Sequence, residues 1–244
     1  MKPLSEPDIL KIWEWGQSRH PVERILGPLA LTLPDQTWEE LYGLSIGQRD
    51  QYLLALYEVT FSPNLDCMSD CPGCGESLEF NLRIGEIKTA ETMKVTDGLE
   101  IEEGSYTVKF RLPDSNDLNA ISNCNDEEDA RRLLIRRCVL KAQKNGKSMS
   151  STRLPIKVIK SIADRMAECD PQADILLDLK CPACRHNWQL LLDIAIYLWN
   201  EIKGYAVRLL EEVHILAANY GWGEEQILDM NPGRRRHYLR MLSI

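Results

Sequence analysis

The chain has 244 residues, of which 44% are hydrophobic and 27% charged, with eight cysteines and a formal net charge of −8. This composition excludes a disordered chain, and no apolar run approaches the roughly 18 residues that a membrane helix needs. The negative charge argues against a general nucleic-acid binder, because phosphate neutralisation requires Lys and Arg. The N-terminus has no apolar core of the signal-peptide kind, so we expect a cytoplasmic protein. Its cysteines then stay reduced and point to metal binding or catalysis more than to disulfides.

The N-terminal region, residues 1–64, is predicted to be helical. Ser5 can cap a first helix, because its hydroxyl can accept a hydrogen bond from the free backbone amides of the first turn. Thr37 followed by Glu40 is typical of a capping box. A further amphipathic helix is predicted from about 45 to 59.

Strand patterns begin after this region. Alternation of apolar and polar residues over 78–82 predicts a half-buried strand that leaves a tight turn. Residues 99–101 and 106–110 flank a short acidic turn and predict a β hairpin. A further strand is predicted over 173–180, whereas 188–192 fits a strand or a helix.

Helical patterns return between the predicted hairpin and the last strands, and again at the C-terminus. Asn125 or Asp126 can cap a helix whose unit ends at 145–146, and Pro155 precedes another amphipathic helix. A long helix is predicted over 193–220, followed by short helical turns to the end of the chain.

Two Cys-x-x-Cys units share the form Cys-Pro-small-Cys: Cys71 with Cys74, and Cys181 with Cys184. A turn of two residues lets both thiolates point at one ion, and two such turns supply the tetrahedral four-sulfur shell that structural zinc prefers. The 106 residues from 75 to 180 separate the units, so the zinc ribbon would be discontinuous. A closed four-thiolate site predicts folding energy and no catalysis.

Other interpretations of the cysteines remain open. Cys-Pro-Ala-Cys between a strand and a helix also resembles a redox dithiol, although two near-identical copies argue against it, and the turns could simply carry free thiols. Cys67 or His186 could substitute for a ligand. The last three cysteines have no partner spacing and are predicted to be buried apolar residues: Cys124, Cys138 and Cys169.

The predicted fold class is α+β, mainly helical, with a discontinuous four-cysteine zinc ribbon and an inserted β hairpin. We divide the chain into four parts. They are an N-terminal helical region, 1–64; the ribbon, 65–90 and 170–193; an inserted β hairpin with a basic helical region, 91–169; and a C-terminal helical region, 194–244.

Charge is segregated along the chain. Residues 131–160 hold ten Lys or Arg and no acid, so the rest of the chain carries −18. This stretch could pair with acids of the same chain, dock on an acidic protein surface, or bind nucleic acid, which the absence of interleaved aromatic residues disfavours. Its basic residues are Arg131, Arg132, Arg136, Arg137, Lys141, Lys144, Lys147, Arg153, Lys157 and Lys160.

Two further features have simple interpretations. Glu211 and His214 form a lone Glu-x-x-His, whereas di-iron sites need two, so a polar helix face is the expected role. Trp13 and Trp15 cannot face the same side of one helix, which makes one of them a candidate interface anchor.

Several short motifs follow one another in a fixed order. Together they resemble the T4-type phage baseplate protein family of contractile phage tails and phage-like contractile injection systems, and the resemblance covers most of the chain. The motifs include Ile46-Gly47-Gln48-Arg49-Asp50, Cys71-Pro72-Gly73-Cys74-Gly75, Arg111-Leu112-Pro113, Asp170-Pro171-Gln172-Ala173-Asp174, Cys181-Pro182-Ala183-Cys184, Leu198-Trp199-Asn200-Glu201-Ile202, Tyr220-Gly221-Trp222 and Arg234-Arg235.

The resemblance implies a baseplate or hub component, or an assembly factor for one, without enzymatic activity. Its partners would be other baseplate, hub or spike proteins rather than a small-molecule substrate. Assembly would be cytoplasmic, with a place in the finished particle left open. The sequence departs from the family pattern at Arg185, where Gly is usual, and at Gly223, where Ser often caps the following helix.

Two functions of other classes stay open beside this one. The first is a zinc-ribbon nucleic-acid-binding protein that uses residues 131–160. The second is a dithiol oxidoreductase, which predicts no metal and a thiol of low pKa at Cys71 or Cys181.

Overall fold

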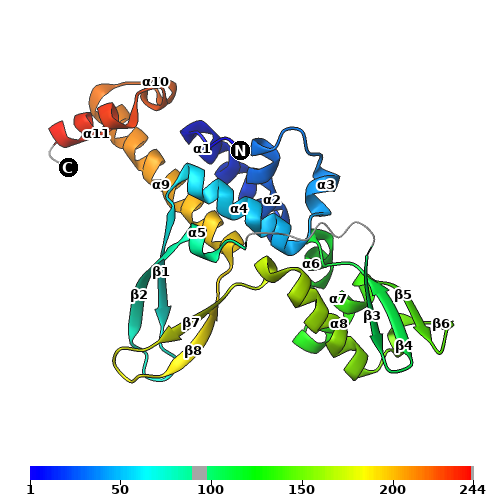
Figure 1. Ribbon diagram of the computed structural model, residues 1–244. Coiled ribbons are helices and arrows are strands. Elements are labelled where there is room, and N and C mark those ends of the chain that lie inside the picture. The colour runs from blue at the N-terminus through cyan, green and yellow to red at the C-terminus, as the bar shows by residue number, and fades with distance from the viewer. Residues whose placement is uncertain (90–97, 243–244) are drawn as a thin grey trace.

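A computed structural model describes residues 1–89 and 98–242 and divides into a helical body, a β arm and an α/β lobe (Figure 1). The body is a set of helices from both ends of the chain. The long helix α9 runs through it and packs against α1, α2 and α4. Its helices are α1 (Glu6–Gly16), α2 (Pro21–Thr32), α3 (Trp38–Tyr42), α4 (Ile46–Thr60) and α9 (Ile194–Tyr220).

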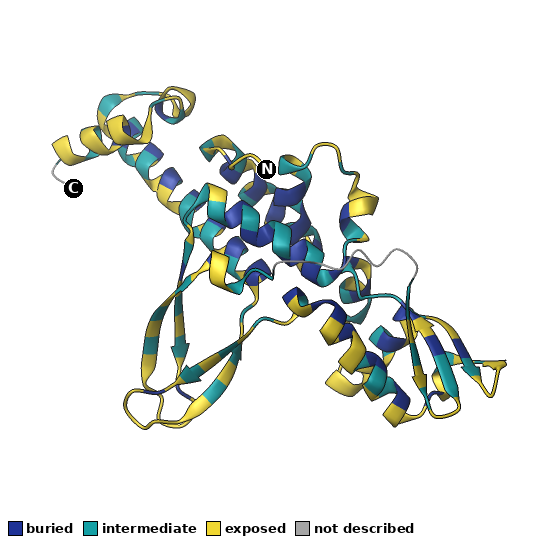
Figure 2. Cartoon of the chain, in the orientation of Figure 1, coloured by how far each residue is buried: buried dark blue, intermediate teal, exposed yellow. Residues whose placement is uncertain are grey.

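The body holds the largest apolar core of the described residues (Figure 2). Leu26 of α2, Leu53 of α4 and Ile202 of α9 are fully buried within it. The predicted caps are confirmed: Ser5 accepts from the backbone of the first turn of α1, and Thr37 with Glu40 forms the capping box of α3. The core therefore joins the N-terminal helices to a helix almost two hundred residues later.

The arm consists of two antiparallel hairpins that leave the body and converge at a distant tip (Figure 1). The strand before the first cysteine turn, β1, was not predicted, because Asp and Ser interrupt its apolar residues. Residues 187–191 form a strand, which settles the strand-or-helix alternative. The strands are β1 (Asn64–Asp70), β2 (Ser77–Arg83), β7 (Leu176–Lys180) and β8 (Asn187–Leu191), with α5 (Ile84–Ile87) and the 3₁₀ turn η2 (Pro171–Ala173) at their base.

The lobe contains a four-stranded antiparallel sheet rather than the single hairpin expected from sequence. The order is β3-β4-β5-β6, and the turn between the added strands is Asn145-Gly146, with φ of 50° and 76°. Positive φ at both turn residues is the signature of a tight β-hairpin turn. The strands are β3 (Leu99–Glu103), β4 (Tyr106–Phe110), β5 (Val139–Lys144) and β6 (Lys147–Met149). The helical pieces are α6 (Ser115–Ile121), α7 (Glu127–Cys138), the 3₁₀ turn η1 (Ser151–Arg153) and α8 (Ile156–Cys169).

The lobe has its own core and its own charged anchor. Phe110 and Ile162 are fully buried between the sheet and α8. Asp117, also fully buried, receives hydrogen bonds from Arg111 and Arg137 at 3.0 and 2.8 Å. Burial alone would raise the pKa of Asp117, but the hydrogen bonds from Arg111, the Asp114 backbone amide and Arg137 outweigh it and lower this pKa to about 2.

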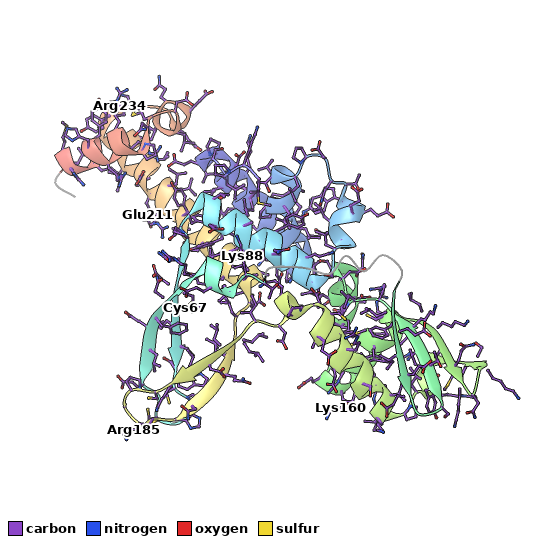
Figure 3. All side chains as sticks on the ribbon, viewed as in Figure 1. Cys67, Lys88, Lys160, Arg185, Glu211 and Arg234 are labelled. Carbon is purple, nitrogen blue, oxygen red and sulfur yellow. The ribbon has the colours of Figure 1, made fainter. Side chains whose placement is uncertain are left out.

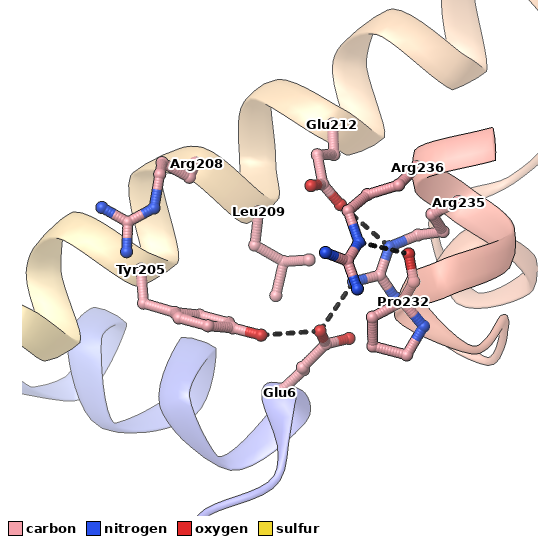
Figure 4. Close-up of a pocket in the computed structure, with 8 residues that line it drawn as sticks. All are labelled: Glu6, Tyr205, Arg208, Leu209, Glu212, Pro232, Arg235 and Arg236. Carbon is pink, nitrogen blue, oxygen red and sulfur yellow. Dashed lines mark hydrogen bonds and ion pairs between the residues drawn. The ribbon is translucent and has the colours of Figure 1, made fainter. Parts of the chain in front are cut away.

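Two short helices, α10 (Glu224–Leu228) and α11 (Pro232–Met241), close the far end of α9. Arg235 of α11 is buried and binds Glu6 of α1 at 2.7 Å and Glu212 of α9 at 3.0 Å (Figure 4). Tyr205 also donates to Glu6, at 2.8 Å, beside a cavity of about 270 Å³. This cluster ties the C-terminal helix to the first helix of the chain.

The α+β, mainly helical class is confirmed. Among the described helices, none combines the length and apolar character that crossing a lipid bilayer would require.

Candidate metal centre

The two Cys-x-x-Cys turns meet at the tip of the arm. Both turns fold in the same way: the amide of Cys71 donates to the carbonyl of Glu76 at 2.8 Å, and that of Cys181 to His186 at 2.9 Å. In each turn the first cysteine is buried and the second exposed. The two hairpins therefore present four thiols to one point from segments 106 residues apart.

The four sulfurs form a compact cluster. All ligand atoms of Cys71, Cys74, Cys181 and Cys184 lie within 4.8 Å of one another. Across the hairpins, the Sγ atoms of Cys71 and Cys184 are 3.6 Å apart, as are those of Cys74 and Cys181. Four sulfurs at about 2.3 Å from one tetrahedral ion lie about 3.8 Å apart, so the spacing fits a four-thiolate metal site.

Backbone amides donate to two of the four sulfurs. Gly73 donates to the Sγ of Cys71 at 3.4 Å. The amide of Cys184 donates to the Sγ of Cys181 at 3.5 Å, and it is the main cause that lowers the pKa of Cys181 to about 7. Because metals bind the thiolate, this amide favours metal binding at Cys181. The amide of Glu76 lowers the pKa of Cys74, but the hydrogen bonds of Cys74 with Cys184 and Cys181 outweigh it and instead raise this pKa to about 12.

The remaining candidate ligands lie outside the cluster. Within the described residues, the group of potential ligands at the tip contains neither Cys67 nor His186. Cys67 packs on the core of the body, and His186 stacks on Trp188. Cys138 and Cys169 are buried as predicted, whereas Cys124 is only half-buried, so the prediction for Cys124 was wrong.

Arg185 occupies a position that suits glycine. It follows the second cysteine of its unit, and its φ is 63°. Gly75 holds the same place in the first turn with a φ of 77°. The two turns are thus equivalent, and Arg185 places a side chain in the left-handed region at the arm tip (Figure 3).

The basic stretch 131–160 is divided between helices and strands of the lobe, which corrects the expectation of a basic helical region. Three of its ten basic residues bind carboxylates of the chain: Arg132 binds Glu128, Arg137 binds Asp117, and Lys157 binds Glu103. Within the described part of the chain, ion pairs therefore involve only a minority of the ten basic residues in this stretch.

The two tryptophans of α1 have different surroundings. Trp13 packs against the core of the body, whereas Trp15 lies 5.9 Å from the exposed ring of Trp38 in an apolar groove. Glu211 and His214 are exposed on α9 and belong to none of the described clusters of potential ligands.

The fold and the cluster define a class: a mainly helical α+β protein whose arm carries four cysteines that could hold one metal ion. A scan against protein families matches the model described as T4 bacteriophage base plate protein over residues 30–195. This match spans both cysteine units and more than half of the chain, so the protein belongs to that family. No curated protein and no solved structure matches the chain.

Membership of the family makes the protein a structural component of a phage baseplate and a part of the tail particle. It also implies association with other baseplate proteins. The resemblance drawn from the sequence motifs is thereby confirmed.

Proposed function

We propose that the protein is a non-enzymatic structural or assembly component of the baseplate or hub of a contractile phage tail-like injection system. A structural Zn²⁺ held by Cys71, Cys74, Cys181 and Cys184 stabilises it. The observation that carries the proposal is the convergence of four thiols at the arm tip, in a protein of the baseplate family. Its partners are baseplate, hub or spike proteins of the same particle.

Zinc would act as a clamp between distant segments. The arm hairpins continue into the body at α5 and α9, so an ion at the tip links two cysteine units that 106 residues separate along the chain. Four thiolates complete a tetrahedral shell and leave no open position for a substrate or water. This chemistry supports a role in stability, and it supports the assignment as a non-enzyme.

Metal analysis of the purified chain tests the clamp. We expect one zinc per chain, and we expect Cys181→Ser to lose the metal together with the ordered arm. Cys67→Ser is the matched control, since it removes a half-buried thiol from the same arm outside the cluster. A metal-free chain with an ordered arm, or loss of zinc in Cys67→Ser, would overturn the proposal.

Assembly tests the injection-system role. The chain is co-expressed with the sheath, hub and spike proteins of its own particle and purified through a tagged copy. Recovery of these proteins in a stoichiometric complex supports the role. Their absence from the purified chain, with zinc present, would contradict the role while leaving the clamp intact.

A further inference from the structure

The most exposed large apolar side chain among the described residues lies in a basic setting. Ile156, at the start of α8, is 79% exposed. Arg153 ends the helical turn just before it, and Lys157 and Lys160 lie on the first turns of α8, with Lys160 one turn along the same helix face. All three cations are exposed, and Lys160 is marked on the lobe in Figure 3. We call these four residues the basic patch.

The next most exposed large apolar side chain lies in an acidic setting. Met68, in β1, is 70% exposed. Side chains alternate along a strand, so Asp66 and Asp70 share its face, and Glu79 of β2 pairs directly with it. All three acids are exposed, and residues 64–82 contain no Lys or Arg. We call these four residues the acidic patch.

The acidic patch is also hollowed. A depression of about 480 Å³ is lined by Asp66, Met68, Glu79 and Asn81, together with Cys67 and Phe80. Apolar atoms and carboxylates therefore line one concave surface, and an apolar side chain surrounded by cations complements it in both polarity and charge.

The two patches belong to different parts of the molecule. The arm and the lobe diverge from the body, and the hairpin β1–β2 lies on the side of the arm away from the lobe (Figure 1). Each patch is thus open to a neighbouring molecule. Of the three basic side chains, only Lys157 binds a carboxylate within the described residues, Glu103, and it stays 82% exposed.

We propose that the acidic patch of one molecule docks on the basic patch of a second copy of this chain. Ile156 enters the depression beside Met68, and the flanking cations face Asp66, Asp70 and Glu79. Since two different patches meet, the contact is heterologous and repeats head to tail, which generates a ring or a filament. The contact goes beyond the proposed function, since it requires an ordered arm but no particular partner protein.

Sedimentation of the full chain tests the contact. We expect self-association that grows with protein concentration in about 0.1 M salt and weakens in about 1 M salt, where charges are screened within about 3 Å. The paired substitutions R153E/K160E remove the basic patch, and D70K/E79K remove the acidic patch. None of these four side chains makes an ion pair within the described residues. Each double variant should raise the dissociation constant at least about tenfold.

Mixing the two double variants gives the decisive measurement. Each variant keeps one native patch, so the mixture contains a complete contact and should associate although neither variant does alone. I156S should also weaken association, whereas L140S, which alters another exposed apolar residue of the lobe, should not. Metal content and circular dichroism confirm that every variant is folded.

Three results would overturn the proposal. One is a wild-type chain that stays monomeric at all concentrations, and another is a mixture that fails to associate. The third is a chain that does not self-associate but binds short RNA, with this binding lost in R153E/K160E. The basic patch would then be a nucleic-acid surface. None of these results changes the zinc content, so failure of this contact is distinguishable from failure of the metal clamp.

Discussion

The arm and the lobe both contain antiparallel strands, but they differ in how much apolar surface they bury. The lobe buries Val108, Phe110 and Ile162 completely between its sheet and helices. In the described arm strands only Leu65, at the base, is buried, and the next buried residues are Cys71 and Cys181 at the tip (Figure 2). The lobe thus follows the usual rule of apolar burial, and the arm does not.

The proposed metal site at the arm tip would account for this difference. A two-stranded hairpin is marginally stable by itself in water. Two such hairpins with half-buried inner faces lack the core that would fix their mutual position. The proposed metal ion at the tip would supply that connection with four ligands, and the arm could then extend from the body while exposing both outer faces.

Removal of the metal should have the largest effect and should separate the two regions. Structural zinc contributes about 10–16 kcal/mol of apparent binding energy in small zinc domains. We therefore expect a strong chelator to abolish hydrogen-exchange protection in β1, β2, β7 and β8 while the lobe strands keep theirs. Equal protection of the arm with and without chelator would show that packing alone holds it.

Truncation of one phenylalanine in each region should give the next largest effect. Phe110→Ala removes a fully buried ring, and we expect it to destabilise the lobe by about 3–5 kcal/mol. Phe80→Ala is the matched control, because its ring is only half-buried on β2 and should cost far less. Unfolding in denaturant, monitored by hydrogen exchange, measures the loss of stability in each variant. An equal loss in the two variants would contradict the division between the regions.

Acid should weaken the lobe through Asp117. The pKa of this carboxyl is about 2 in the folded protein, below its ordinary value near 4, because Arg111 and Arg137 bind the charged form. A lowered pKa stabilises the fold above about pH 4, and this contribution is lost as the pH falls from about 4 to 2. Asp117→Asn should be less stable at neutral pH and should lose this pH dependence in the lobe.

The readout must be hydrogen exchange within the lobe, since acid would also protonate the thiolates of the proposed metal site and release its metal. Asp114→Asn is the control, because burial raises the pKa of Asp114, so its protonation in acid does not destabilise the fold. An unchanged acid profile in Asp117→Asn would show that other carboxylates dominate.

Local signals in the sequence predicted the helices and the cysteine cluster, because caps and Cys-x-x-Cys spacing act within a few residues. Strand β1 was not predicted, because its Asp and Ser residues disfavour strands. Both of its aspartates belong to the acidic patch. Strands β5 and β6 were missed, although Asn145-Gly146 is a strong hairpin signal. The Arg235 cluster could not be predicted, since its partner Glu6 is 229 residues away.

Relief of backbone strain at the arm tip should give the smallest effect, with opposite signs in the two cysteine turns. A side chain in the left-handed region destabilises the fold by about 1–2 kcal/mol. Replacing it with glycine recovers only part of this free energy, because glycine makes the unfolded chain more flexible. We expect Arg185→Gly to stabilise the arm by about 1 kcal/mol or less, and Gly75→Ala to destabilise it similarly. Zinc competition with a chromogenic chelator detects both. The arm has almost no buried core that could compensate for a strained turn. The change in stability should therefore appear directly as a change in the metal affinity of the arm. Arg185→Lys should leave this affinity unchanged.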